Sequence, residues 1–340
     1  LDYTQYDFWL NRPDLVLQRL GNPDDNAMSQ WQKMVSYRQT RNPEKPAILP
    51  AFLNTLDFEL KGPEKIAVGA SVQLAYEIQA NQSEKAKSLH LIVNQVPVYG
   101  VEGKTLTSAI GELEIALTPG INKLKVYLTD EYGTQSETQF LTYNRRSEAG
   151  KPDLYILAVG VSDYKIDRLD LDYASKDAQD IVQVFEQNTE FDQVMSMQLL
   201  DLDATKDAVI AAKTFLQQAR AQDTVVVFFA GHGMLDTDNN YYFGTTDIDP
   251  EEPQGNGLSY AAMTNLLDGI PSRQKLMMMD TCYSGEVTES AQHLDLPNGV
   301  TTRGLTYATE SEVNISLSML QKTFVDLRSS TGAIVISAAG

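Results

Sequence analysis

The chain has 340 residues, 42% of them hydrophobic, and a formal net charge of −19 at pH 7. This length predicts two domains with an additional helical segment, because one hydrophobic core seldom serves so long a chain. The acidic excess excludes DNA and RNA as partners, since proteins that bind the phosphate backbone present clustered lysine and arginine side chains.

Cysteine and histidine are scarce, which limits the covalent and metal chemistry available. The single cysteine, Cys282, cannot form an intrachain disulfide, and the three histidines have no metal-ligand spacing. No apolar run is long enough to span a membrane, and the amino end lacks the basic and apolar segments of a signal peptide. These features favour a cytoplasmic protein with no membrane partner. The start without methionine and the end directly after an apolar segment indicate a piece of a longer protein.

Residues 1–46 predict a helical N-terminal segment. Apolar residues recur there at helical spacing in two stretches, and Gly21 is a suitable stop for the first helix. We expect Trp9 and Trp31 to pack on a neighbouring domain.

Residues 47–146 predict an all-β sandwich, because short alternating segments are separated by turn residues. His90 lies in one of these segments and is expected to be a packed or edge histidine. Residues 103–105, Gly-Lys-Thr, look like the end of a phosphate loop, but Val98 stands where that loop needs a glycine, so a hairpin turn is expected. The passage 118–136 resembles the last hairpin of immunoglobulin-like modules.

A polar stretch at 144–153 predicts the linker to a last domain, 152–340, in which strands and helices alternate. Its first strand is continuously apolar, as in a parallel sheet buried on both faces. The pattern predicts a doubly wound α/β domain with a mostly parallel sheet. Strands are expected at 154–161, 193–200, 224–230, 275–280 and 332–338. Helices are expected at 173–187, 205–219, 259–270 and 316–330, with a polar insertion at 286–314.

The expected topology brings distant residues to one crevice. Ligands of doubly wound sheets bind outside the carboxyl ends of the strands, where the strand order reverses. If the order begins 2-1-3-4, the ends of the first, third and fourth strands lie side by side. Those ends carry Asp163, His232 and Cys282.

Cys282 and His232 are the candidates for nucleophilic catalysis. A thiol becomes a strong nucleophile when it loses its proton, and a neighbouring imidazole can accept that proton. Glycines on both sides of His232 leave the backbone open to a substrate peptide. The amides of Gly233 and Cys282 are candidates for an oxyanion hole, which together predicts amide hydrolysis. The alternative is an inert buried thiol beside a packed core histidine.

Five segments extend this inference to a family. In chain order they are LYILAVGVSDY, YASKDA, FFAGHG, MMDTCYSG and TGAIVISAAG. They resemble the caspase-like cysteine peptidases, and most closely the bacterial members of metacaspase or orthocaspase type. In caspases the histidine precedes the cysteine by about 50 residues, as it does here. The resemblance covers about 153–340, and the segment before it resembles the immunoglobulin-like module that some bacterial members carry.

The resemblance also implies a substrate pocket for arginine or lysine. Asp280 and Asp177 occupy the places of the pocket carboxylates of metacaspases, and Asp163 and Ser337 are further candidates. Strand alternation puts Asp280 on the same side as Cys282. Alternatively, Asp177 is a helix-face acid bound to Lys176 or to solvent.

Several alternatives stay open. The acidic loop 236–252 suggests calcium activation, but it lacks the glycine and the closing glutamate of an EF-hand loop, so we expect no required cofactor. The expected partners are a protein or peptide substrate and a regulatory protein bound through the N-terminal domains. The segment between Glu286 and Ser330 is expected to be an autoprocessing linker, with Arg303, Lys322 and Arg328 as candidate sites. The rival functions are a peptidase specific for Asp or Asn and a non-catalytic caspase-like scaffold.

Overall fold

The computed structural model describes residues 7–21, 25–41, 56–63, 70–79, 82–146, 150–236, 240–283 and 331–337. The chain divides into two compact units. One comprises Leu1–Ile92, Glu102–Ile115 and Lys123–Tyr143, and the other comprises Val93–Val101, Ala116–Asn122 and Asn144–Gly340. The predicted helix 316–330 and the candidate processing sites Arg303, Lys322 and Arg328 lie outside the described residues.

The N-terminal segment is helical, as its periodicity predicts. It forms α1 (Asp7–Leu10), α2 (Pro13–Arg19) and α3 (Asp25–Arg41). Proline at the first position of α2 suits a helix start, because its missing N–H would have no partner there. Gly21 follows α2 with a φ of 69°, a left-handed conformation that glycine adopts without steric cost.

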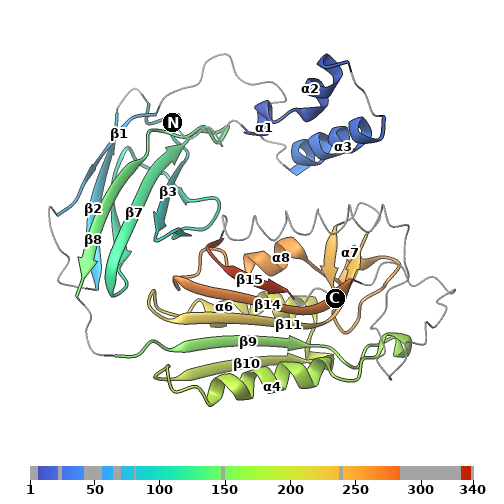
Figure 1. Ribbon diagram of the computed structural model, residues 1–340. Coiled ribbons are helices and arrows are strands. Elements are labelled where there is room, and N and C mark those ends of the chain that lie inside the picture. Colours follow the sequence, from blue (N-terminus) through green and yellow to red (C-terminus); the bar gives the residue numbers. More distant parts are fainter. Residues whose placement is uncertain are drawn as a thin grey trace. The chain divides into compact units, whose positions relative to one another are not determined.

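Two sheets of short strands follow, and they confirm the predicted all-β region (Figure 1). The strands are β1 (Phe58–Lys61), β2 (Ser71–Ile78), β3 (Ser88–Val93), β4 (Val96–Pro97), β5 (Lys104–Thr105), β6 (Ile110–Ala116), β7 (Gly120–Thr129) and β8 (Gln139–Arg145). One sheet has the order β1-β2-β6, and the other has the order β4-β3-β7-β8, with β5 added to β3. Buried residues alternate along β2, β3 and β7, because one face of each strand packs on the core.

Two local predictions for this region are confirmed. Gly103 has a φ of 71° and turns the chain into β5, which pairs antiparallel with β3, so residues 103–105 belong to a β turn and short strand. His90 is a packed histidine. Its ring stacks on Tyr127 with centroids 4.8 Å apart, Nε2 lies 3.1 Å from the Thr129 hydroxyl, and burial lowers its pKa.

The α/β part has the predicted topology. Its strands are β9 (Leu154–Gly160), β10 (Val194–Leu200), β11 (Thr224–Leu235), β12 (Tyr241–Phe243), β13 (Leu258–Ser259), β14 (Gln274–Tyr283) and β15 (Ile334–Ser337). Strands β10, β9, β11, β14 and β15 are parallel neighbours in that order, which confirms the 2-1-3-4 arrangement (Figure 1). The short strands β12 and β13 add an antiparallel extension beside the carboxyl end of β11, and this extension was not predicted.

Helices cover both faces of this sheet. One face packs on α4 (Ala174–Glu186) through its predicted apolar side, which includes Ala174, Ala178 and Val182. The opposite face packs on α5 (Lys206–Ala211), α6 (Lys213–Leu216) and α8 (Tyr260–Asn265). A further short helix, α7 (Pro253–Asn256), precedes β13. Thr205 caps α5 by accepting the N–H of Ala208, as predicted.

Two predicted helix bounds are wrong. The single helix expected over 205–219 is divided at Ala212 into α5 and α6. The helix expected over 259–270 ends at Asn265 and continues as turns. The residues that follow the two shortened helices include Ala219 and Ile270, which are buried in the apolar core. Tertiary packing therefore outweighs helical propensity there. Within the described residues, none of the helices combines the length and apolar character that crossing a bilayer requires.

Candidate active site

The strand register brings the two candidate catalytic positions together. Strands β11 and β14 run parallel, and His232 is the Cα partner of Cys282 in the ladder between them. Residues paired in this way lie next to each other across the sheet. Two positions that are far apart in the sequence are therefore neighbours at the carboxyl end of the sheet. The side chain of Cys282 lies outside the described atoms.

His232 is held through both its ring and its backbone. Its Nε2 lies 2.8 Å from the carbonyl oxygen of Leu169, in the 3-10 turn Asp167–Leu169 between β9 and α4. A carbonyl oxygen can only accept, so Nε2 carries the proton and Nδ1 is the acceptor of the neutral ring. The half-buried imidazole is thus arranged to receive a proton at Nδ1.

Tyr164 supports the same histidine from the core. Its hydroxyl accepts the backbone N–H of His232 over 3.0 Å, and the two rings lie with centroids 5.2 Å apart. Burial raises the pKa of Tyr164, so the hydroxyl stays protonated and can also donate to the carbonyl oxygen of Gly244 at 3.4 Å.

The glycine before His232 has a packing role as well. Gly231 has a φ of 152°, and a Cβ there would lie 2.9 Å from the Tyr164 hydroxyl and 3.1 Å from the Phe243 ring. A side chain at this position would push away Phe243 and Tyr164, of which Tyr164 holds the histidine. Gly233, the candidate oxyanion donor, is buried at the point where β11 begins to pair with β12.

The candidate pocket acids lie on the α4 face of the sheet or beside it. Met278 and Ala230 pack in the core under α4, and Asp280 is the Cα partner of Ala230, so alternation puts the half-buried Asp280 on that face. Asp177 is half-buried in the first turn of α4. Asp163 is exposed in the loop after β9.

Ser337 is not brought together with Asp280. It is the Cα partner of Met279, and both Met279 and Val335 pack in the core on the opposite face, under α5, α6 and α8. Alternation along β15 therefore points the Ser337 side chain away from the α4 face. The register thus separates this candidate pocket residue from the others.

The simpler interpretation of Asp177 names Lys176 or solvent as its partner. Lys176 forms its ion pair with Asp180, one turn further along α4. The (i, i+4) spacing favours this pair on a helix surface.

Three contributors to the site were not identified from the sequence. They are the hydroxyl of Tyr164, the carbonyl of Leu169 and the carboxylate of Asp201. Asp201 directly follows β10 and accepts hydrogen bonds from the backbone N–H groups of Ser162 and Asp163 at 2.8 and 3.0 Å. An acid at the end of the second strand was the available signal for Asp201, whereas a backbone carbonyl such as that of Leu169 has no sequence signature.

The acidic loop after β11 uses its carboxylates for its own hydrogen bonds. Asp236 accepts from the backbone and side-chain amides of Asn240 at 2.8 and 2.9 Å and from the Tyr242 hydroxyl at 3.2 Å. In the described part of the chain, no three His, Cys, Asp or Glu side chains lie close enough together to hold a metal ion.

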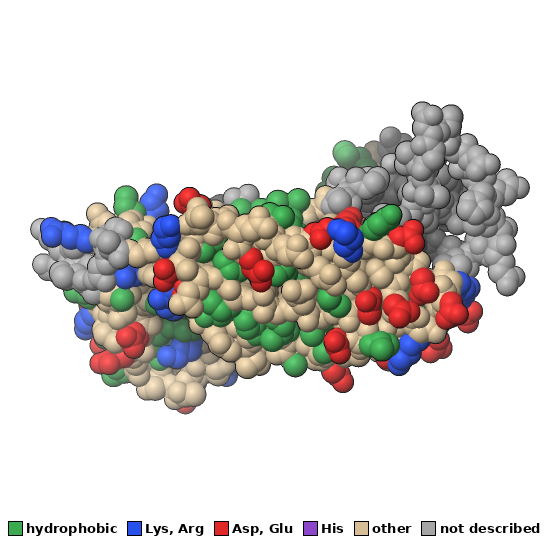
Figure 2. Space-filling view, turned by 90° about the horizontal axis from the view of Figure 1, so that it is seen from below, with side chains coloured by type: hydrophobic (Ala, Val, Ile, Leu, Met, Phe, Trp, Pro, Cys, Tyr) green, Lys and Arg blue, Asp and Glu red, His purple; other side chains and the backbone are tan. Residues whose placement is uncertain are grey.

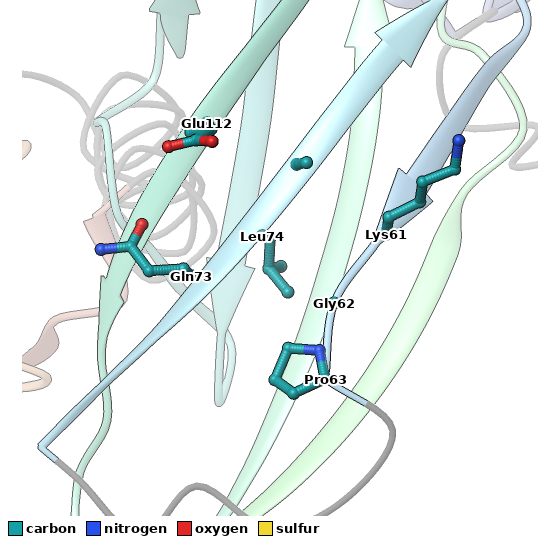
Figure 3. Close-up of a pocket in the computed structure, with 7 residues that line it drawn as sticks. Lys61, Gly62, Pro63, Gln73, Leu74 and Glu112 are labelled. Carbon is teal, nitrogen blue, oxygen red and sulfur yellow. The ribbon is translucent and has the colours of Figure 1, made fainter.

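A separate hollow of about 450 Å³ lies on the three-stranded sheet of the all-β region (Figure 3). Its lining comes from β1, β2 and β6 and the turn after β1, and consists of Lys61, Gly62, Pro63, Gln73, Leu74, Ala75 and Glu112. None of these lining residues carries a thiol or an imidazole.

Comparison with protein families agrees with the predicted fold. The family model for the caspase domain matches residues 154–332, which is more than half of the 340-residue chain. The chain belongs to the caspase family of peptidases. A search of curated protein sequences gave no match.

Solved structures show only low overall similarity. The structure of pro-sf-caspase-1 is 16% identical, with 48% of this chain and 55% of that chain covered and a TM-score of 0.25. The fibronectin(III)-like modules of Clostridium thermocellum CbhA are 14% identical, with 27% and 100% covered and a TM-score of 0.22. The catalytic module of the metalloprotease ZmpA from Clostridium perfringens is 16% identical, with 26% and 16% covered and a TM-score of 0.18. The chain thus spans little more than half the length of the procaspase.

Proposed function

We propose that this protein is a cysteine endopeptidase with Cys282 as the nucleophile and His232 as the general base and then the general acid. The observation that carries the proposal is the parallel pairing of these two positions at the carboxyl end of β11 and β14. It is supported by the Leu169 carbonyl, which leaves Nδ1 of His232 as the proton acceptor.

The proposed reaction balances with these two residues and water. His232 takes the thiol proton, and the sulfur of Cys282 attacks the scissile carbonyl carbon. The amides of Gly233 and Cys282 are proposed to donate to the oxyanion. The C–N bond then breaks as His232 gives its proton to the leaving amine. Water, deprotonated by the same histidine, hydrolyses the thioester and restores the thiol.

We propose cleavage after arginine or lysine, with Asp280 and Asp177 as the pocket carboxylates and Asp163 at its rim. The support is electrostatic, because Asp280 lies on the α4 face, Asp177 lies in the first turn of α4 and Asp163 lies in the loop after β9. Carboxylates at a partly buried site favour a cationic side chain over a neutral or acidic one. Ser337 is left out of this pocket because of the face on which it lies.

A fluorogenic peptide panel that varies the residue before the cut tests the proposal. We expect the wild-type protein to cleave after Arg and Lys, and Cys282→Ala to lose at least about 1000-fold in kcat/KM, since the covalent step is removed. Cleavage only after Asp or Asn would support the alternative specificity. No cleavage of any peptide by a folded wild-type protein would favour the scaffold, and equal rates in wild type and Cys282→Ala would rule out this nucleophile.

The all-β region has a separate proposed role. We propose that it is an immunoglobulin-like module that binds a regulatory protein, on the support of its two sheets of alternating strands.

A further inference from the structure

One carboxylate oxygen joins the two segments that carry candidate pocket acids. Oδ1 of Asp201 accepts the backbone N–H of Ser162 at 2.8 Å and that of Asp163 at 3.0 Å, both in the loop after β9. The same oxygen accepts the hydroxyl of Ser175, in the first turn of α4. Asp201 lies at the end of β10, so three elements meet at this atom.

Further hydrogen bonds tie the same loop to the same helix. The backbone N–H of Ser175 donates to the Ser162 hydroxyl at 2.9 Å, and the N–H of Ser162 also lies 3.1 Å from the Ser175 hydroxyl. Tyr173, the residue before α4, makes no side-chain cap, so Ser162 supplies a helix cap from outside the helix. The position of α4 along the sheet therefore depends on the loop that Asp201 holds.

The loop after β9 and helix α4, which Asp201 joins, both carry residues of the proposed site. The backbone N–H of Asp163 donates a hydrogen bond to Asp201, and Asp177 is two residues beyond Ser175 on α4. Tyr164 follows Asp163, and its hydroxyl accepts the backbone N–H of His232. A shift of the loop after β9 would therefore move Asp163, Asp177 and Tyr164.

The backbone conformation of Asp201 suits an aspartate at this position. Its φ is 46°, in the left-handed region that aspartate and asparagine tolerate better than other residues with a side chain. Burial alone raises the pKa of Asp201, but the hydrogen bonds from Ser175, Ser162 and Asp163 outweigh it and hold the pKa below its usual range. The carboxylate is therefore charged at neutral pH, which strengthens the bonds it accepts.

We propose that Asp201 is a positioning residue for substrate specificity: it fixes the loop after β9 against α4 and so sets the spacing of Asp163 and Asp177 for a basic side chain. This role rests on the proposed peptidase function. Asp201 itself touches neither the substrate nor the reacting atoms.

Three variants separate this role from a general loss of stability. Asp201→Gly removes the acceptor but tolerates the left-handed backbone. Asp201→Asn keeps both an acceptor oxygen and the backbone preference. Asp203→Ala is the matched control, because Asp203 is an exposed acid in the same 3-10 turn, Asp201–Asp203.

Kinetics on two peptides, with Arg or Gln before the cut, give the first measurement, normalised to the amount of titratable thiol. We expect Asp201→Gly to raise KM for the Arg peptide by roughly 10-fold or more while kcat changes less, because misplacement by about 1 Å can cost up to 100-fold. The preference for Arg over Gln should fall by a similar factor. Asp201→Asn should keep most of the wild-type preference for Arg, and Asp203→Ala should behave as wild type.

Hydrogen exchange at the amides of residues 162 and 163 gives the second measurement and needs no catalysis. Faster exchange in Asp201→Gly, together with the lost preference for Arg, would support the inference. Unchanged exchange, or a loss that falls equally on the Arg and Gln peptides, would overturn it. If wild-type protein cleaves no peptide, the proposed function itself fails, and faster exchange in Asp201→Gly would then assign Asp201 a purely structural role.

Discussion

At the scale of single residues, the site depends on how His232 is oriented. Its ring is fixed by the Leu169 carbonyl and its backbone by the Tyr164 hydroxyl. The histidine itself could be predicted from its glycine neighbours and the strand that precedes it. Its two supports could not, because one is a backbone atom and the other depends on how the loop after β9 folds back onto the core.

Tyr164→Phe tests the backbone support. The variant keeps the ring that packs on His232 but removes the hydroxyl that accepts its N–H. A buried N–H without a partner costs about 1 to 3 kcal/mol, so we expect the free energy of unfolding to fall by that order. We also expect kcat to fall roughly 10-fold with little change in KM, because the base is misoriented while the pocket is retained.

Steady-state kinetics and urea unfolding of the same preparation check this prediction. Tyr155→Phe is a suitable control, since Tyr155 is a half-buried tyrosine at the opposite end of β9 from the site. Wild-type kcat in Tyr164→Phe, with or without a loss of stability, would mean that the hydroxyl does not orient the base.

At the scale of elements, the strongly periodic segments could be predicted and the irregular ones could not. The apolar side of α4 and the continuous apolar run of β9 match the structure, because their patterns report burial directly. The break at Ala212 has no glycine or proline signal and follows from packing. The face on which Ser337 lies depends on the register of β15 against β14, which is set by pairing between distant segments.

A buried lysine near the start of β14 gives a prediction at this scale. Lys275 is 4% exposed, and its Nζ donates to the carbonyl oxygens of Leu267 at 2.8 Å and Thr331 at 3.1 Å. It therefore links β14 to the turn after α8 and to the residues before β15. Burial, with a smaller contribution from the positive charge of Arg273, lowers its pKa to about 7.

The sign of the pH effect follows from this pKa. In the unfolded chain the amine titrates near 10.4, so between about pH 7 and 10 the unfolded state binds a proton that the folded state has lost. Raising the pH through this window therefore stabilises the folded state, by up to about 1.4 kcal/mol per pH unit. Lys275→Met removes this contribution, although it also lowers stability at every pH because two carbonyls lose their donor.

Urea unfolding at pH 7, 8 and 9 measures the difference. We expect the free energy of unfolding of wild type to rise relative to that of Lys275→Met as the pH rises. Lys176→Met, which alters an exposed lysine paired with Asp180, should keep the wild-type pH dependence. Parallel curves for wild type and Lys275→Met would show that Lys275 stays charged in the folded protein.

At the scale of the whole molecule, the net charge of −19 acts over a distance that local contacts do not reach. Acidic side chains gather toward one end of the face seen in Figure 2. Such a field attracts a cationic peptide before any contact forms and raises the association rate. Salt weakens this attraction, because the Debye length shrinks from about 30 Å at 0.01 M to about 3 Å at 1 M.

Two peptides with the same Arg before the cut separate this long-range effect from the pocket. One has a net charge of about +3, and the other is neutralised by acids far from the cut. For the cationic peptide, we expect kcat/KM to fall several-fold between about 10 mM and 500 mM NaCl, through slower association. For the neutral peptide, kcat/KM should change much less, since short-range contacts with the proposed pocket acids Asp280 and Asp177 would be screened less than distant charges. Equal salt dependence of the two peptides would assign the attraction to the pocket alone and not to the charge of the whole molecule.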